Sequence, residues 1–558
     1  MVVLRRSPGD RPAADFGGTK LSLLMEKQDN RGHDGAGAAI LSSHPEAGYQ
    51  PYWLYKSASS TALVDLLGAI AKRKTDPYSR IFLGHLRYAT FGKNETAFCH
   101  PFVHQASELC HTVLLAGNFN LTNATELFDD YSRHGSFATS RADGYLICEL
   151  IAKALMKDVP IAHAISTALA NADGAWTLCG MTGDGWAFAT RDPHGIRPGF
   201  YYVDDNVAVV ASERPAIQAA FDVAPEAVRE LPPGGTLVIS PEGDVQLNPQ
   251  TSKPAYRPCS FERIYFSRAN DADIHRERKA LGAALLPQIL KAADAPVEDI
   301  FFSYIPNSAR IAFHGLLEEL ITTSLAQSRR EVEINIPRFG EIAVKDAKFR
   351  TFIADAAARR EFYKHVYDVT YGLVRPGRDT LVVLDDSIVR GNTMKNAILP
   401  MLDRLGPKRI VIASSAPPIR YPDCYGIDMS TLGELVAFRA LVNLLDREGG
   451  DGTAERELKE ALEGHVTPQS NPLAPLYALF AEEAHTAEIA RLLTPPGMKA
   501  EVKVVYQTIP ALRQCLAPNS QLPIGDWYFT GDYPTSGGYK VLHKALANYL
   551  AHSTDRSY

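Results

Sequence analysis

The segment from Leu381 to Thr393, LVVLDDSIVRGNT, holds the residues of this 558-residue chain that are best suited to chemistry. Its apolar run predicts a strand buried on both faces, as in a parallel sheet. Asp385 and Asp386 follow at the carboxyl end, where open α/β sheets bind ligands. The loop then leads into an amphipathic helix, and a loop before a helix N-terminus can hold a phosphate. Two adjacent carboxylates suit hydrated magnesium or ribose hydroxyls. The segment predicts a phosphosugar site; the alternative is a structural turn whose Asp and Ser only cap the helix.

This segment resembles the loop that binds phosphoribosyl pyrophosphate (PRPP) in type I phosphoribosyltransferases. Its spelling, DDSIVRG, is most similar to that of the amidophosphoribosyltransferase family. The resemblance implies that the two acids contact the ribose hydroxyls and magnesium. It further implies that the following residues surround the 5-phosphate of PRPP: Ser387, Arg390, Gly391, Asn392 and Thr393. The implied enzyme is a glycosyltransferase of purine biosynthesis, which converts PRPP, glutamine and water into 5-phosphoribosylamine, glutamate and pyrophosphate.

Two more segments fit this resemblance. SYIPNSAR, which ends at Arg310, stands where the family has its pyrophosphate loop. Asn307 replaces the usual acid there, but the hydroxyl of Ser308 can still meet a metal ion or a phosphate. VKDAKFRTFI, residues 344–353, resembles the flexible loop that closes over PRPP. Its cations are expected to neutralise the departing pyrophosphate: Lys345, Lys348 and Arg350. A solvated basic patch is the alternative interpretation of this loop.

The first 250 residues resemble the class-II, N-terminal-nucleophile glutamine amidotransferase domain that the same family carries. HLRYATFG implies that Arg87 binds the glutamine α-carboxylate, GNFNLTN implies that Asn118 contributes to the oxyanion hole, and SRADGYL implies that Asp143 binds the α-amino group. Two positions depart from the family's pattern: His33 replaces a Gln in RGHDGAG, and Phe119 replaces a Gly beside Asn118. Phe119 keeps a backbone N–H, but its bulk is expected to narrow the pocket.

The nucleophile expected of this domain is missing from the sequence. The family uses a cysteine at the N-terminus of the mature chain, whose own α-amine serves as the base. This sequence opens with MVVL, and Cys99 and Cys110, which come later, lack an α-amine and cannot substitute. Two interpretations stay open: the start lies a few residues late, or glutamine hydrolysis is lost. The alternative functions are an ammonia-dependent phosphoribosyltransferase and a PRPP-sensing regulatory protein with an inactive glutaminase domain.

The resemblance also bears on cofactors and assembly. Some relatives hold an iron–sulfur cluster on four cysteines. Cys259 in CSFERIYF and Cys424 in DCYGID match the first two positions, but IGDWYFTGDYP has no cysteine and Cys515 lies too far upstream. We therefore expect magnesium and no iron–sulfur cluster. Homo-oligomers and feedback inhibition by purine nucleotides are further expectations from the family.

Composition limits the class of protein. A hydrophobic content of 46% and a charged content of 22% are typical of a soluble globular protein. The net charge of -6 gives no general basic field, which argues against nucleic acid as a partner. No apolar run approaches the roughly 18 residues of a membrane span, and no secretion signal is evident at the start. The seven dispersed cysteines indicate reduced thiols, so we expect a cytoplasmic protein.

The length predicts two or three domains. Over residues 1–250, short apolar runs broken by turn signals predict antiparallel sheets with helices, an α+β layered domain. Residues 260–445 alternate between helix and strand patterns, which predicts a doubly wound parallel sheet. A helical extension is expected over 446–558. With the resemblance, the expected fold is an α+β N-terminal-nucleophile-type layered domain followed by an α/β type I phosphoribosyltransferase domain.

Overall fold

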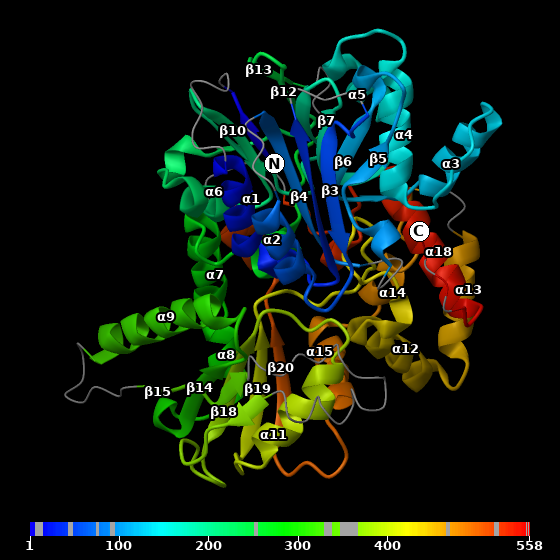
Figure 1. The fold of residues 1–558 in the computed structure, drawn as a ribbon. Coiled ribbons are helices and arrows are strands. Elements are labelled where there is room, and N and C mark those ends of the chain that lie inside the picture. Colours follow the sequence, from blue (N-terminus) through cyan, green and yellow to red (C-terminus); the bar gives the residue numbers. More distant parts are fainter. Residues whose placement is uncertain are drawn as a thin grey trace.

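Two antiparallel sheets packed face to face form the N-terminal part of the computed structural model (Figure 1). The structure describes residues 1–558 except 6–14, 43–47, 74–77, 90–94, 250–254, 329–336, 346–366, 465–468, 518–523, 554, 556 and 558. One sheet has seven strands in the order β11-β9-β10-β1-β4-β2-β3: Arg229–Glu230, Phe200–Val203, Val207–Ala211, Val2–Leu4, Ser79–Arg87, Gly35–Ser42 and Tyr52–Ser57. The other has six in the order β13-β12-β8-β7-β6-β5: Val245–Asn248, Thr236–Ile239, Ala187–Arg191, Gly174–Thr182, Val113–Leu121 and Phe102–His104.

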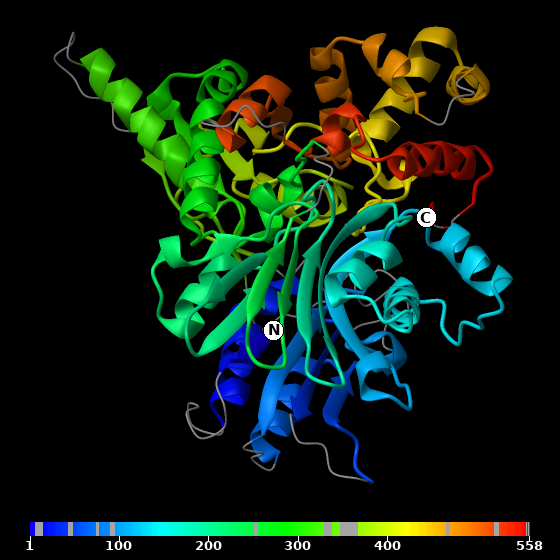
Figure 2. The same ribbon diagram turned by 90° about the horizontal axis from the view of Figure 1, so that it is seen from above.

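Side-chain alternation along these strands builds the layers. Val3 points into the core between the two sheets, where it packs with Leu114 and Ala189, whereas Val2 faces the helices outside. Helices cover both outer faces, and Figure 2 shows them outside the two sheets. They are α1 Phe16–Lys27, α2 Ala62–Lys72 and α6 Arg214–Phe221 on the first sheet, and α4 Asp143–Leu155 and α5 Ile161–Ala168 on the second. The α+β layered arrangement expected from the sequence is confirmed.

A five-stranded parallel sheet forms the second part of the molecule. Its order is β15-β14-β18-β19-β20: Arg338–Phe339, Ile300–Tyr304, Thr380–Asp385, Arg409–Ser414 and Glu501–Tyr506. In β18, Leu381 and Val383 pack on one face while Val382 and Leu384 pack on the other, and all four are buried. Helices cover both faces: α8 Leu286–Ala293 and α9 Arg310–Ser328 on one, and α11 Leu399–Asp403, α12 Val436–Gly449 and α15 Glu482–Leu493 on the other. This is the parallel sheet that the sequence predicts.

The expected division at residue 445 is wrong in one respect. Strand β20 lies within the segment predicted to be a helical extension, yet it pairs in parallel with β19 over six residues. Val504 and Tyr506 pack on one face of the sheet and Val505 on the other, so the strand completes the core of the parallel sheet. The remaining C-terminal helices are α13 Thr453–Gly464, α14 Ala474–Ala478, α16 Ile509–Leu516, α17 Trp527–Thr530 and α18 Ser536–Leu550.

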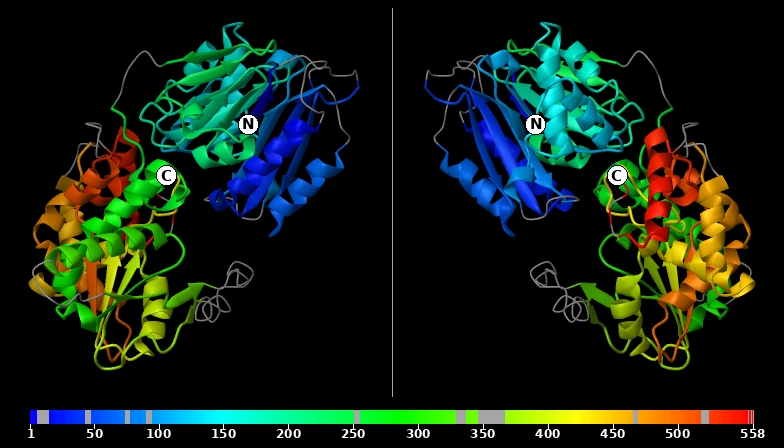
Figure 3. Two further views of the ribbon diagram at one scale, coloured as in Figure 1. Left: turned by 90° about the vertical axis from the view of Figure 1, so that its left-hand side faces the viewer. Right: turned by 90° about the vertical axis from the view of Figure 1, so that its right-hand side faces the viewer.

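The two parts are joined by direct contacts, and Figure 3 shows α18 beside the N-terminal sheets. Asp173, which precedes β7, accepts hydrogen bonds from the Thr535 hydroxyl at 2.6 Å and the Gly537 N–H at 3.0 Å. Lys540 of α18 pairs with Glu126 of α3 (Ala124–Arg133) at 2.9 Å. Helix α7 (Ala272–Ala284) leads from the first part into the second. None of the described helices is both long and apolar enough to cross a membrane.

Candidate functional site

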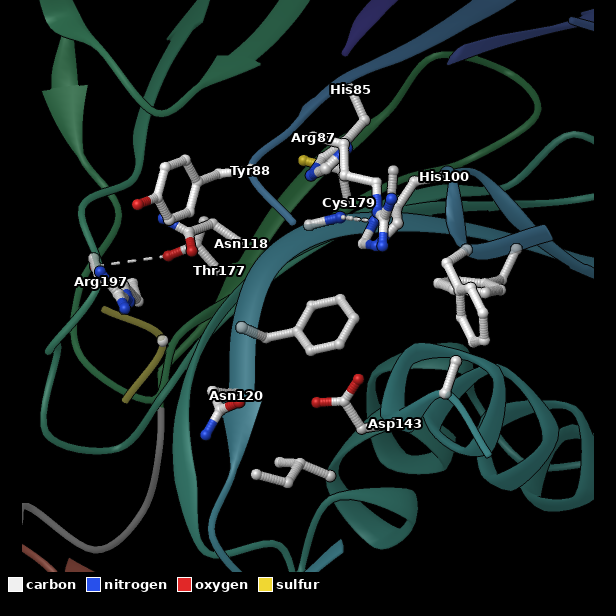
Figure 4. A pocket seen from close by; sticks show the side chains of 18 of the residues that line it. His85, Arg87, Tyr88, His100, Asn118, Asn120, Asp143, Thr177, Cys179 and Arg197 are labelled. Carbon is white, nitrogen blue, oxygen red and sulfur yellow. Dashed lines mark hydrogen bonds between the residues drawn. The ribbon is translucent and has the colours of Figure 1, made fainter. Parts of the chain in front are cut away.

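A cavity of about 860 Å³ brings together the glutamine-site residues expected from the sequence (Figure 4). Arg87 is the last residue of β4, Asn118 lies in β6 and Asp143 is the first residue of α4; all three line this cavity. Burial away from water raises the pKa of the Asp143 carboxyl to about 6. One carboxylate oxygen of Asp143 accepts the Gly144 N–H at 2.9 Å, which orients the group at the start of its helix. The sequence-based grouping of these residues therefore matches their placement.

A row of stacked rings forms one wall of the cavity, and the sequence did not predict it. The rings of His85 and His100 stack with centroids 3.9 Å apart, and Phe119 follows at 5.3 Å from His100. The Gly117 N–H donates to Nδ1 of His100 at 3.2 Å. Burial lowers the pKa of His85 to about 4 and that of His100 well below its usual value, so both rings are neutral at physiological pH. Phe119 thus sits against the His100 ring and gives the cavity wall an apolar surface.

The structure also places Met1, His33 and Cys179 relative to the cavity. Met1 lines the cavity, and its α-amine donates to the Val210 carbonyl at 2.7 Å. His33 does not face the cavity, since its side chain is half exposed and lies 3.4 Å from Asp29. Cys179 contributes a thiol to the cavity wall, and burial raises its pKa. Neither Cys99 nor Cys110, which the sequence analysis rejects as nucleophiles, is among the residues that line the cavity.

The cavity extends towards the second part of the molecule along a buried network of charges. Arg31 of the RGHDGAG segment bonds Glu213 at 2.7 Å and Glu262 at 2.6 Å. Burial alone would lower the pKa of Arg31, but the two carboxylates outweigh it and raise the pKa. Arg197 bonds the same Glu262 at 3.1 Å and also donates to the Tyr425 carbonyl. Glu262 belongs to the FERIYF segment, so the network ties the cavity to residues of the second part.

The two acids at the end of β18 form a compact polar cluster. The Asp386 N–H donates to the Asp385 carboxylate at 2.9 Å, and the Ser387 hydroxyl donates to the Asp386 carboxylate at 2.8 Å. The hydroxyl of Ser308, from the loop after β14, donates to the other oxygen of Asp386. Because β14 and β18 are adjacent parallel strands, their carboxyl ends bring these residues together. The expected grouping of Ser308 with both acids therefore matches the structure.

The electrostatics of this cluster indicate a shortage of positive charge. Burial and the neighbouring Asp386 raise the pKa of Asp385 well above its usual value. Burial also raises the pKa of Asp386, although Ser308, Ser387 and the Arg278 guanidinium oppose the shift. Arg278 donates hydrogen bonds to backbone carbonyls, including that of Tyr265 at 3.0 Å. A divalent cation or ligand hydroxyls would therefore be stabilised at the two acids.

Two tyrosines that the sequence did not single out lie within electrostatic range of the acids. Tyr265 follows the FERI segment, and Tyr367 begins β17 (Tyr367–Val369), which pairs with β16 (Ala343–Lys345). Burial and the charges of Asp385 and Asp386 raise the pKa of both phenols to about 12. Both hydroxyls are therefore neutral at physiological pH. No sequence spacing relates these two residues to the acids, because only the fold brings them near.

The remaining residues of the expected PRPP site divide into three groups. Gly391 has φ +74°, and a Cβ there would lie 2.3 Å from a Leu493 methyl, so the loop requires glycine. Arg390 is held by Glu434 at 2.8 Å and Asp428 at 3.4 Å, while Asn392 and Thr393 are exposed at the start of the helix. The side chain of Lys345 and the whole of Lys348 and Arg350 lie outside the described residues.

The two cysteines at the iron–sulfur positions lie in an aromatic core. The Cys259 thiol is 2.9 Å from the Tyr528 hydroxyl, and the backbone of Cys259 bridges to Gly525. Trp527 donates to Asp423 at 3.1 Å beside the buried Cys424. Tyrosine and glycine therefore stand beside Cys259, where a cluster would require further thiolates. The expected absence of a cluster stays a prediction.

The chain is similar to known proteins in sequence and in structure. Residues 99–219 match the family model of a glutamine amidotransferase domain. The chain is similar to an amidophosphoribosyltransferase of Bacillus subtilis (strain 168), with 32% identity over 383 residues, covering 66% of this chain and 72% of the relative. It is similar to that of Archaeoglobus fulgidus, with 28% identity over 387 residues, covering 68% and 78%. A solved structure, described as the allosteric regulatory enzyme of purine biosynthesis, superposes with TM-score 0.67 and 25% identity, covering 96% and 95%.

Proposed function

The chain belongs to the amidophosphoribosyltransferase family, and from this premise we propose that it forms 5-phosphoribosylamine from PRPP and ammonia, the first committed step of purine biosynthesis. One observation carries the assignment. Asp385, Asp386 and Ser308 meet at the carboxyl edge of a parallel sheet, and a loop that needs glycine at position 391 follows them. That arrangement suits a ribose with a 5-phosphate on one side and a metal-bound pyrophosphate on the other.

The reaction calls for positioning and charge rather than a protein nucleophile. Ammonia attacks the anomeric carbon while the bond to pyrophosphate breaks, and negative charge develops on the leaving group. Asp385 and Asp386 would accept hydrogen bonds from the ribose hydroxyls and fix the ring for attack. Lys345, Lys348 and Arg350 are proposed to neutralise the pyrophosphate, as expected from their segment.

Magnesium fits the donor set at this site. Two carboxylates with raised pKa values and a serine hydroxyl offer oxygen ligands of the kind that magnesium prefers. We propose that Asp385, Asp386 and Ser308 hold the ion, directly or through water. When bound, magnesium would supply positive charge to the pyrophosphate.

The cavity supports glutamine as the source of ammonia. Arg87 offers a cation for the α-carboxylate, Asp143 an anion for the α-amino group, and Asn118 an amide near the carbonyl to be attacked. The same cavity reaches Glu262 and Gly426, which supports passage of ammonia towards the second part. We therefore propose residues 1–250 as a glutaminase domain and residues 260–445 with β20 as the phosphoribosyltransferase domain. The C-terminal helices over residues 446–558 pack around both.

Ammonium-dependent release of pyrophosphate from PRPP is the direct test. We expect release that requires magnesium and rises with pH, because free ammonia is the attacking species. A regulatory protein that only senses PRPP would bind it without releasing pyrophosphate. Such a result, obtained with folded protein at saturating magnesium, would refute the proposed reaction and favour the sensor.

Assembly and regulation follow from the same premise. We propose a cytoplasmic homo-oligomer that purine nucleotides inhibit. Light scattering of the purified chain measures its assembly, and nucleotide titrations of pyrophosphate release measure inhibition. A monomer that is insensitive to nucleotides would contradict both parts of this proposal.

A further inference from the structure

A cluster of metal-binding side chains lies between β5 and β6, and none of its members lines the cavity. We propose that Glu108, Cys110 and His111 bind zinc or a similar soft divalent transition-metal ion, with water as the remaining ligand. The inference concerns residues outside both proposed substrate sites. It therefore stands or falls independently of the proposed function.

The three donor atoms lie close to the spacing of a tetrahedral site. Oε2 of Glu108 lies 3.3 Å from Nδ1 of His111 and 3.9 Å from Sγ of Cys110. All three donor atoms lie within 4.8 Å of one another. Zinc at about 2.0–2.2 Å from nitrogen and oxygen and about 2.3 Å from sulfur places tetrahedral neighbours roughly 3.3–3.8 Å apart. Small side-chain movements would therefore bring all three donors onto one ion.

The backbone that carries these donors is braced on both sides. The residues form a single 3-10 turn, Leu109–His111, closed by the His111 N–H to the Glu108 carbonyl at 3.1 Å. The buried Thr112 hydroxyl then accepts the Ala106 N–H at 3.1 Å and donates to the Ala106 carbonyl at 3.3 Å. A braced turn loses little conformational freedom when it binds an ion.

The turn between β7 and β8 packs on this segment, since the Gly183 N–H donates to the Thr112 carbonyl at 2.9 Å. The next residue, Asp184, accepts a hydrogen bond from the Thr182 hydroxyl and is a neighbour of the site rather than a ligand. Three protein ligands leave the fourth tetrahedral position to water. Binding would form the metal–sulfur bond and release the thiol proton to solvent.

The donor set selects the class of metal. Magnesium and calcium prefer oxygen ligands throughout, whereas thiolate with imidazole and carboxylate suits zinc. Exposed carboxylate–histidine pairs without a thiol occur elsewhere in the chain, for example Asp130 and His134 at 3.6 Å. Cys110 is what distinguishes the proposed site from such pairs, and it is the exposed cysteine among the seven.

Cobalt is the probe for the test, because only sulfur ligation gives a thiolate-to-cobalt charge-transfer absorption. Cobalt added to the full chain in excess magnesium should produce this absorption, and zinc should remove it by competition. Zinc should also slow labelling of Cys110 by an aromatic disulfide reagent by at least about tenfold. Cys110→Ser should abolish the absorption, and His111→Ala and Glu108→Gln should weaken cobalt binding by at least about tenfold. His134→Ala is the matched control and should change neither result.

Three outcomes would overturn the proposal. They are no charge-transfer absorption in the unaltered chain, an absorption that persists in Cys110→Ser, and labelling of Cys110 at the same rate with and without zinc. All the substituted side chains lie on the surface or at its edge, so circular dichroism should show an unchanged fold.

Discussion

Replacing Asp385 with Asn is expected to weaken PRPP binding and, at the same time, to stabilise the ligand-free protein. The substitution keeps the shape of the side chain and removes its charge. In the folded protein the carboxylate accepts the Asp386 N–H at 2.9 Å, which an amide oxygen can also accept. Asp386 is a less clean target, because its oxygens also accept bonds from Ser308 and Ser387. The Asp385 variant therefore isolates the effect of charge.

The magnitudes follow from the two roles of the carboxylate. Loss of a charge-assisted contact to ribose or metal costs on the order of 1.5–3 kcal/mol, or roughly ten- to a hundredfold in PRPP affinity. In the ligand-free protein, removing the charge has the opposite effect and stabilises the folded state. The pKa of Asp385 is higher in the folded than in the unfolded chain, so the folded state binds the proton more tightly. Unfolding free energy therefore falls as pH rises from about 4, the ordinary Asp value, through the folded pKa. The Asn variant has no carboxyl group to ionise at this position, so its unfolding free energy does not fall for this reason.

Calorimetry with PRPP and magnesium measures the affinity, and thermal denaturation between about pH 4 and 8 measures stability. Asp451→Asn, on an exposed turn, is the control and should alter neither. Unchanged PRPP affinity in the Asp385 variant would refute the assignment of this loop. A gain in melting temperature that is equal at both ends of the pH range would refute the electrostatic argument.

Three further outcomes are expected. Because Asp143 has a pKa of about 6, calorimetric glutamine affinity should rise between about pH 5 and 7 and then level off. Asp143→Asn should remove this dependence, and a rise that persists would place the titrating group elsewhere. Cys-Gly-Ile placed ahead of Met1 adds three residues that span about 10 Å, and Met1 lines the cavity. The new N-terminal cysteine can therefore reach the cavity, and glutamate release should exceed that of the chain beginning at Met1. Equal release, with the cysteine exposed as the new N-terminus, would contradict the assignment of the pocket. Gly391→Ala forces a Cβ to 2.3 Å from Leu493 at φ +74° and should lower stability by on the order of 1–3 kcal/mol, seen as a lower melting temperature. An unchanged melting temperature would show that the loop rearranges freely.

Local patterns in the sequence were sufficient for the elements that carry the chemistry. The run before Asp385 forms β18, buried on both faces, because an unbroken apolar stretch has no side to turn towards water. The acids come at its end, and Gly391 stands where the backbone needs a positive φ. Arg87, Asn118 and Asp143 were grouped through motif resemblance, and all three line the same cavity. These inferences depend on short motifs and on residues a few positions apart, both of which can be seen in the sequence.

Contacts between distant residues were decided by the tertiary structure alone. Strand β20 was missed because a parallel partner needs only a short apolar strand, and its pairing with β19 depends on a crossover of more than eighty residues. Arg31 reaches Glu262 across 231 positions. The stack of His85, His100 and Phe119 likewise joins β4, the bend before β5, and β6. The sequence determines local periodicity, turn chemistry and the identity of the reactive groups. The packing of whole layers decides which of these groups meet. The reason is that the free energy of burial comes from the entire core and not from any local pattern in the sequence.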